Sequence, residues 1–410
     1  MARNFICAVD VGSSRIKAAA GEVLPGERIN VLGISSAPST GIRRGTVIDA
    51  PATAEAIDSV LNELEHLTGV PINETRVCFS APSLFSFVNR AAVAVSNPSG
   101  EITSPDLERL LKSARMVNIP PTHSMVHLVP RHYTIDGMEG VREPSGMIGH
   151  RLEAEVLIIA VATSFLQNLV NTLGRAGVKV RDLAISSFLS AEAVLAASEK
   201  DMGVVLIDIG GGTTDLAVYT RGAPLLSAVL PLGGEHITND LAIGLRTMAS
   251  EARSLKENYG CCSTVLADEE VLFNVTSIYG KESRVISEKT LASIIEPRVQ
   301  ELMQFIADEL DKAGLTGRLP GGAVFTGGSA KLKGILQVGE EYLMMNTRIG
   351  YPENIWGDFD HLKNPEYSSL IGALLFGNQA REMVAHDNRE VTHFSKYLEK
   401  VVDKFMYFLK

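Results

Sequence analysis

The sequence predicts an α/β fold in which two similar halves are joined and an α+β subdomain is inserted into the first. Residues 203–219 are an aliphatic run that reaches Asp208, breaks at three consecutive glycines and resumes, which is typical of a buried hairpin with a tight turn. Residues 5–23 repeat this pattern, with an apolar strand that ends at Asp10. Between residues 84 and 162 the pattern changes to short strands and a single helix. Two such hairpins about half a chain apart suggest a duplicated fold.

The first hairpin turn has the composition of a phosphate-binding loop. The strand ending at Asp10 is followed by Gly12 and by two hydroxyl residues, Ser13 and Ser14. These can donate hydrogen bonds from backbone and side chain, and Lys17 adds a positive charge within reach of a β- or γ-phosphate. Alone, this turn is a weak signal.

The rest of the first half alternates strands with a helix. The chain returns from the turn as a strand over 16–23, and Pro51 opens a helix through residue 67 with one apolar face. A strand over 76–79 follows. A helix between strands indicates an α/β layer.

The inserted subdomain reads as a small α+β unit. A helix is predicted over 104–116, an extended segment over 124–135 with an interruption at Pro130, and an apolar strand over 153–162. We find no nucleophile–base arrangement in it and predict an interaction module. A helix over 163–174 and a strand over 178–183 then return the chain to the first half.

The second hairpin turn is the central motif. An alanine-rich helix over 190–198 precedes it. Its turn consists of Gly210, Gly211, Gly212, Thr213 and Thr214. The glycines remove side chains where a ligand must approach the backbone, and the hydroxyls add donors, so the turn suits a phosphate. Asp208 beside that phosphate requires a divalent cation between them. The alternative is an ordinary glycine hairpin turn.

Two further glycine turns follow in the second half. Gly233, Gly234 and Glu235 end a strand and lead into a helix over 237–245, whose N-terminal dipole could face a nucleotide. Helices over 251–259 and about 294–310 come next. The last turn contains Gly327, Gly328, Ser329 and Lys331. Its strand–diglycine–helix form lets the backbone come close to an adenosine and its α-phosphate.

Composition narrows the class of protein. The chain has 410 residues, of which 45% are hydrophobic, enough for two or more domains with substantial cores. The net charge of −10 argues against a general nucleic-acid binder. We see neither a leader peptide nor a stretch of about 20 apolar residues, and therefore expect a cytoplasmic protein.

Neither cysteine nor histidine spacing indicates a metal or disulfide site. Cys7, Cys78, Cys261 and Cys262 are best explained as buried thiols. His123, His127 and His132 are close in sequence, but they lie on an apolar run that Pro130 interrupts, which disfavours zinc.

The last residues form an amphipathic helix pattern behind a polar linker over 378–393. Apolar residues recur at steps of three and four: Phe394, Tyr397, Leu398, Val401, Val402, Phe405, Phe408 and Leu409. In residues 394–410, four lysines against two acids leave a formal charge of +2. This predicts a helix that lies in the membrane interface. The alternative is a helix docked on the protein's own core.

The combination of loops resembles the actin-like ATPase superfamily. Asp10-x-Gly-Ser-Ser-x-x-Lys17 is similar to its first phosphate motif, Asp208-x-Gly-Gly-Gly-Thr-Thr-Asp215 to its second, and Thr326-Gly-Gly-Ser329 to its adenosine motif. The resemblance implies two duplicated RNase H-like domains around a nucleotide cleft, with ATP as ligand. It implies Mg²⁺ held through water near Asp10 and Asp208, and carries over Lys256 as a nucleotide-binding residue.

Within this superfamily the chain resembles the FtsA family of bacterial division proteins. The resemblance rests on the insertion at 84–162 with Val129-Pro130 and Ile135-Asp136, on Glu296-Pro297-Arg298, and on the amphipathic tail. It implies the following parts: a first core domain (1–83 and 163–200), an inserted subdomain for polymerisation (84–162), a second core domain (201–233 and 298–377), an outer subdomain that receives the C-terminal peptide of FtsZ (234–297), a linker (378–393) and a membrane helix (394–410).

The family resemblance also implies a function. It points to filaments on the inner face of the cytoplasmic membrane at the division site, which tether FtsZ filaments and recruit later division proteins. Two departures concern the nucleotide. Where active relatives place Gln or Glu to orient water, this chain has Ser186-Ser187-Phe188, and Glu192 is more than a turn away, so at most slow ATP hydrolysis is expected. Arg253 stands where relatives often carry Glu, which leaves the ribose contact open.

Two other functions fit the same motifs. An enzyme of this fold, such as a kinase or a chaperone, is disfavoured because no phosphoryl-acceptor base and no large C-terminal substrate domain can be assigned. A pilus-type actin homologue that serves as a membrane platform remains the weaker alternative.

Overall fold

The computed structural model describes residues 5–24, 28–72, 74–278, 283–357 and 360–376. The predicted linker over 378–393 and the predicted membrane helix over 394–410 lie outside these residues. Among the described helices, none is both long and apolar enough to cross a bilayer.

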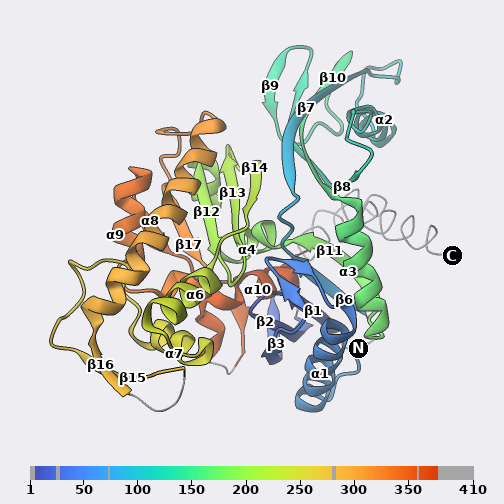
Figure 1. Ribbon diagram of the computed structural model, residues 1–410. Helices are drawn as coiled ribbons and strands as arrows, with labels where there is room; N and C mark the ends of the chain where they lie inside the picture. Colours follow the sequence, from blue (N-terminus) through green and yellow to red (C-terminus); the bar gives the residue numbers. More distant parts are fainter. Residues whose placement is uncertain (1–4, 25–27, 73, 279–282, 358–359, 377–410) are drawn as a thin grey trace.

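Two central sheets repeat one strand order, as Figure 1 shows. The first sheet contains β11 (Val180–Ile185), β6 (Thr75–Phe79), β1 (Phe5–Val11), β2 (Arg15–Val23), β3 (Ile29–Pro38) and β19 (Ile355–Trp356), in this order. The second contains β18 (Thr347–Ile349), β17 (Ala323–Thr326), β12 (Val204–Ile209), β13 (Thr214–Thr220) and β14 (Ala223–Leu230). In each sheet three consecutive strands are antiparallel and a later strand joins the first of them in parallel. The predicted duplicated α/β fold is confirmed.

Helices complete the first domain and bury its core. They are α1 (Ala50–Thr68), α3 (Thr163–Arg175), α4 (Ser186–Val194) and α10 (Ser368–Leu375), with the small hairpin β4 (Ile42–Arg43) and β5 (Thr46–Val47) before α1. The Asp49 carboxylate accepts a hydrogen bond from the Ala52 amide and caps α1, and Gly69 ends the helix in the left-handed conformation at φ 65°. Ile57 and Leu64 on its inner face are fully buried in the first core.

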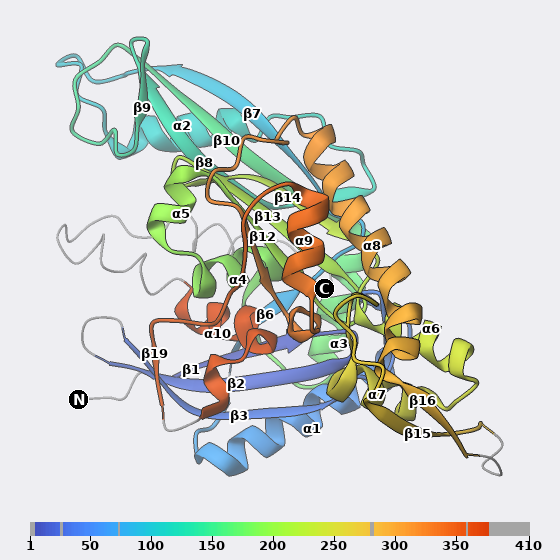
Figure 2. The same cartoon turned by 90° about the vertical axis from the view of Figure 1, so that its left-hand side faces the viewer.

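The inserted subdomain has its own sheet and core. Its strands, in sheet order, are β7 (Phe85–Ala94), β10 (Arg151–Ala162), β8 (His123–Ile135) and β9 (Met138–Val141), and α2 (Ser104–Ala114) packs against β7 and β10. Figures 1 and 2 show this sheet projecting from one end of the molecule, next to β14 of the second sheet. The predicted α+β character of 84–162 is thus observed.

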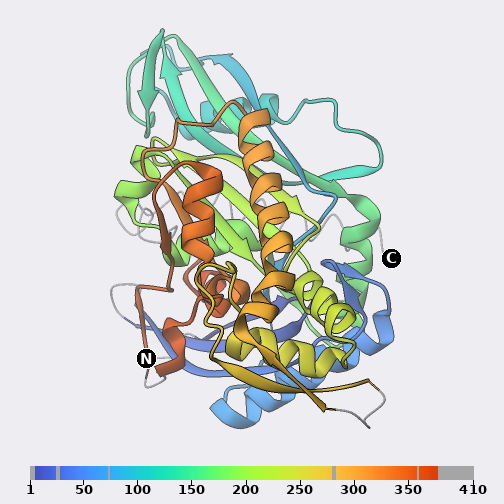
Figure 3. The ribbon, with the colours of Figure 1, turned by 60° about the vertical axis from the view of Figure 1, so that its left-hand side comes forward.

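The second domain carries the remaining elements. They are α5 (Ala197–Met202), α6 (Gly234–Leu245), α7 (Ala249–Tyr259), β15 (Leu272–Thr276), β16 (Ser283–Ser287), α8 (Glu288–Lys312), α9 (Ile335–Leu343) and the 3-10 helix Gly328–Lys331. The 3-10 helices Asp360–Lys363 and Pro365–Tyr367 come before α10, and Leu362 and Tyr367 pack in the first core. Figure 3 shows α8 running along the side of the molecule with α9 beside it, and the β15–β16 hairpin near its start. The buried face of α8 joins the second core.

Two details differ from the sequence analysis. The helix expected over 190–198 is instead two helices, because α4 ends at Val194 and Leu195 is extended. The segment after β18 was expected in the second core domain, but β19 pairs with β3, and α10 packs against α4 and β1 in the first core.

Candidate functional site

The two glycine-containing turns face each other and their tips touch. In the first hairpin Asp10 is paired with Lys17, and in the second Asp208 is paired with Asp215. A Cβ atom added at Gly211 would lie 2.6 Å from Ser14 Cβ, and one added at Gly212 would lie 2.5 Å from Ser13 Oγ. Glycine is therefore needed here for the approach of the two loops, in addition to any ligand.

A cavity of about 550 Å³ lies between the two domains at these loops. Most of the predicted residues line it: Asp10, Gly12, Ser13, Ser14, Lys17, Asp208, Gly210, Gly211, Gly212, Thr213, Glu235, Lys256, Gly327, Gly328, Ser329 and Lys331. Its volume lies within the range of about 300–1,000 Å³ that is usual for ligand and cofactor pockets.

Three predicted residues support the cavity from behind. The Thr214 hydroxyl is buried and donates to the Leu232 carbonyl at 2.8 Å. The Gly234 amide donates to the Gly210 carbonyl at 2.9 Å. A Cβ atom at Gly233 would lie 2.6 Å from the same carbonyl oxygen. The start of α6 is thus fixed against the second loop.

Asp10 and Asp208 are two buried carboxylates on the cavity wall. Burial raises the pKa of Asp208 to about 6, the Ser190 hydroxyl opposes this shift by donating to the carboxylate at 2.6 Å, and the charge of Asp10 adds to it. The Ser369 hydroxyl donates to Asp10 at 3.3 Å. Two carboxylates suit Mg²⁺, which proteins hold with one or two acids while phosphate and water oxygens complete the octahedron. Among the described residues, no group of three or more His, Cys, Asp or Glu side chains could hold a metal ion.

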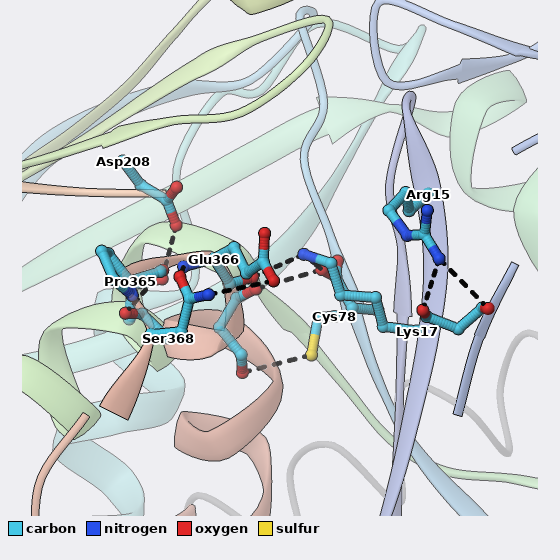
Figure 4. Close-up of polar contacts among 12 residues, drawn as sticks. Arg15, Lys17, Cys78, Asp208, Pro365, Glu366 and Ser368 are labelled. Atoms are coloured by element: carbon cyan, nitrogen blue, oxygen red, sulfur yellow. Dashed lines mark hydrogen bonds and ion pairs between the residues drawn. The ribbon is translucent and has the colours of Figure 1, made fainter. Parts of the chain in front are cut away.

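Lys17 lines the cavity, and Figure 4 shows its side chain extending toward Glu366. Its ammonium lies 3.6 Å from Asp10 and donates to the Glu366 carbonyl, while the Tyr367 ring is 5.6 Å away. The Glu366 carboxylate lies 3.5 Å from Lys331. The sequence analysis did not identify Glu366 or Tyr367, because the segment that carries them has no glycine turn.

Asp215, which ends the second motif, was not predicted as a site residue but lines the cavity. Asp215 is buried at the start of β13 and accepts a 2.7 Å hydrogen bond from the Ser80 hydroxyl of the first domain. Burial, with the charge of Asp208 next, raises the pKa of Asp215 to about 8, which favours the protonated carboxyl at neutral pH. Ser80 follows β6 and lines the cavity with Asp215, so this bond joins the two domains at the cavity wall.

Arg253 and Lys256 of α7 hold the other side of the cleft. Arg253 pairs with Glu235 at 2.9 Å, and Glu235 accepts a hydrogen bond from Ser14 across the cleft at 3.1 Å. Lys256 donates to the Gly234 carbonyl at 3.0 Å, and burial lowers the pKa of its ammonium. The carboxylate beside Arg253 is therefore Glu235.

The helix before the second loop presents hydroxyl groups to the cavity side. Ser186 lines the cavity, Ser190 binds Asp208, and the buried Ser187 hydroxyl lies 3.1 Å from that of Ser227. Glu192 instead pairs with Lys200 at 3.0 Å. Within the described chain, α4 therefore brings no acid to the cavity.

The chain matches two family models. One, described as "Cell division protein FtsA", covers residues 205–372, and the other, "SHS2 domain inserted in FTSA", covers residues 82–160. The second match coincides with the inserted sheet. The inserted subdomain is therefore matched by a family model of its own, separate from the model that matches residues 205–372.

Solved structures with low sequence identity share the fold. The "PilM-PilN type IV pilus biogenesis complex" aligns with a TM-score of 0.66 at 19% identity, covering 91% of this chain and 98% of that one. MreB5 of Spiroplasma citri bound to ADP aligns with a TM-score of 0.55 at 13% identity, covering 93% and 98%. These similarities place the chain in the actin-like ATPase fold.

Curated relatives are similar over nearly the whole chain. The cell division protein FtsA of Pseudomonas aeruginosa is 36% identical over 376 residues, covering 92% of this chain and 90% of the relative. FtsA of Bacillus subtilis is 33% identical over 368 residues, covering 90% and 82%, and FtsA of Escherichia coli K12 is 31% identical over 385 residues, covering 92% and 91%. The resemblance noted from the motifs is confirmed: the chain belongs to the FtsA family of cell division proteins.

Proposed function

We propose that this protein binds ATP with Mg²⁺ in the cleft and, in that state, forms filaments on the inner face of the cytoplasmic membrane. The observation that carries the proposal is the pair of glycine turns, each next to a buried aspartate, that face one cavity from two domains. Ser13, Ser14 and Thr213 would donate to the β- and γ-phosphates, and Lys17 would neutralise part of their charge. Gly327 and Gly328 would let the backbone approach the adenosine.

Asp10 and Asp208 would hold Mg²⁺, through water or directly. The cation would supply charge neutralisation between these carboxylates and the phosphates. The hydroxyls of Ser190 and Ser369 orient the two carboxylates. Because α4 brings no acid to the described cavity, nucleotide turnover would be slow, and the nucleotide would act mainly by holding the two domains together.

The filaments would tether FtsZ to the membrane and recruit later division proteins at the division site. Family membership supports this role. The inserted subdomain, 84–162, would contribute to self-association, and the outer subdomain, 234–297, would receive the FtsZ C-terminal peptide. The apolar stripe over 394–410 would bind the lipid interface weakly, and alignment of many copies in one filament would raise the effective affinity by orders of magnitude.

Electron microscopy of the full chain on lipid monolayers tests the proposal. We expect filaments with MgATP, and their loss from the lipid surface on deletion of residues 394–410. Phe405→Asp should release the protein from liposomes without changing ATP affinity, whereas Ser395→Asp, which adds the same charge on the polar side, should have little effect. Undiminished liposome binding of the Phe405 variant would contradict the anchor. Filaments that need neither nucleotide nor tail would contradict the proposed coupling.

A further inference from the structure

The inserted subdomain covers the free edge of the second sheet. Its strands β7, β8 and β10 contact β14, as Figure 2 shows. The Ser86 hydroxyl of β7 donates to the Ser227 carbonyl at 2.7 Å and accepts from the Ser227 amide at 3.0 Å. One side chain therefore satisfies both backbone groups of an edge residue, as a neighbouring strand would.

Arg131 of β8 makes the second attachment. Its Nε donates to the Pro224 carbonyl at 3.0 Å, and one terminal nitrogen donates to the Thr220 hydroxyl at 3.1 Å. The other terminal nitrogen pairs with Glu155 of β10. The Arg131 side chain is only 8% exposed, and Glu155 lies in the same subdomain, so moving the subdomain away from β13 and β14 would keep the ion pair but break the two hydrogen bonds to the second domain. This contact should therefore oppose movement of the inserted subdomain along β14.

The attachment lies on the same strand as the second phosphate loop. β13 begins directly after Thr213, beside the cavity, and ends at Thr220, beneath Arg131. Ser80, which precedes the insertion, bonds to Asp215 at the cavity end of this strand. A seven-residue strand in the middle of a sheet is stiff. The cleft and the inserted subdomain thus share one rigid element.

The inserted subdomain is covalently joined to the first domain only. At that junction the Ala162 amide donates to the Ser83 hydroxyl at 3.1 Å, and the Thr163 amide donates to the Thr122 carbonyl at 2.9 Å. The attachment to β14 and β13 is non-covalent. The subdomain therefore bridges the two domains that form the cleft.

We propose that Arg131 and Ser86 couple the inserted subdomain to the second domain, so that the subdomain turns relative to the first domain when the cleft opens or closes. The idea that nucleotide binding triggers this opening or closing rests on the proposed function. A rotation of the second domain must either carry the subdomain with it or break buried polar contacts at β14, and the first outcome is the favourable one. A change at the cleft is then transmitted to the outer surface of the insertion.

Distance measurement between spin labels tests this coupling in the full chain. Met116→Cys on the insertion and Leu67→Cys on α1 offer sites that are 85% and 61% exposed, and the four native cysteines are buried. We expect a narrow distance distribution that shifts when a non-hydrolysable ATP analogue with Mg²⁺ binds. In the double variant Arg131→Gln/Ser86→Ala, the distance distribution without nucleotide should be broader than in the parent, and the shift on nucleotide binding should be lost. The nucleotide affinity measured by calorimetry should stay within about threefold of that of the parent.

The matched control is Arg90→Gln. Arg90 pairs with the same Glu155 carboxylate from within the insertion, its side chain is 81% exposed, and the variant should behave like the parent. If the double variant is poorly folded by thermal unfolding, Ser86→Ala and Thr220→Val provide milder tests of the same contacts.

The coupling would be overturned if the distance distributions of the parent and the double variant had equal widths and shifted equally on nucleotide binding. Nucleotide binding without a shift in the parent would also overturn it, while leaving the proposed function intact. If the parent binds no nucleotide, the proposed function fails. In that case the widths of the nucleotide-free distance distributions in the parent and the double variant still decide whether Arg131 and Ser86 hold the subdomain against the second domain.

Discussion

His127 shows how a single buried side chain makes stability depend on pH. It lies fully buried on β8, and its Nε2 accepts a hydrogen bond from the Ile185 amide at 3.4 Å. Burial lowers the pKa of its imidazole from 6.5 to about 3. A group whose folded pKa is lowered stabilises the fold above its unfolded pKa, and that stability is lost as the pH falls from about 6.5 toward 3.

We therefore expect acid to weaken the wild-type protein more than His127→Gln. Between pH 6.5 and 5.5 the additional loss of unfolding free energy should be about 1 kcal/mol, because one proton must be kept off a buried ring. Urea unfolding at the two pH values measures the difference. Parallel losses in both proteins would show that His127 is not held neutral.

Residue chemistry predicted which glycine turns line the cavity, but not the hydroxyl groups that contact their carboxylates. Glycines next to an acid are a local signal, since both the conformational freedom and the charge lie within a few residues. Ser80, Ser190 and Ser369 carry no such signal, because each becomes important only when folding brings it to Asp215, Asp208 or Asp10. A hydroxyl in a buried helix is otherwise unremarkable.

At the scale of elements, α1 illustrates a helix that is defined by its ends. The Asp49 carboxylate accepts from the Ala52 amide at 3.0 Å, which satisfies one of the amides that lack a partner in the first turn. Asp49→Ala should lower the unfolding free energy by about 1 kcal/mol, measured by urea unfolding. Asp49→Asn keeps a side-chain oxygen and should lie within a few tenths of a kcal/mol of wild type. Equal losses in both variants would show that charge, and not the cap, matters.

Helix boundaries could be predicted where one face of the helix is polar, and they could not be predicted where no face is polar. In α1 the buried and exposed residues alternate with the helical period, so its extent could be read from the sequence. In α4, eight of nine residues are buried, so no polar face marks where it begins or ends. The same lack of pattern hides which sheet α10 packs against, since all eight of its residues are buried.

At the scale of the molecule, the candidate site exists only because the two halves meet. Each half supplies one loop, and the Ser14–Glu235 hydrogen bond crosses the cleft between them. The repeated hairpin predicted this meeting, since two copies of one fold tend to use equivalent turns. The contact between Arg131 and β13 was beyond prediction, because nothing in the sequence of an insertion states which surface it will cover.

A ligand that touches both domains should stabilise the whole molecule. With free MgATP at about 100 times its dissociation constant, binding to the folded state alone contributes about 2.7 kcal/mol, which should raise the thermal midpoint. Asp208→Asn should show a much smaller gain, because it removes one of the two carboxylates that would hold the proposed cation. A chelator should reduce the wild-type gain to a similar level.

The matched control is Asp240→Asn, which alters an acid of α6 that pairs with Arg298 at 2.6 Å, away from the residues that line the cavity. The stability that this variant gains from MgATP should equal the wild-type gain, since the substitution removes only an ion pair outside the cavity. Equal gains in all three proteins would exclude Asp208 from the site. A wild-type gain that survives the chelator would exclude the cation while leaving nucleotide binding in place, because the loop hydroxyls and Lys17 would then carry the phosphate charge by themselves.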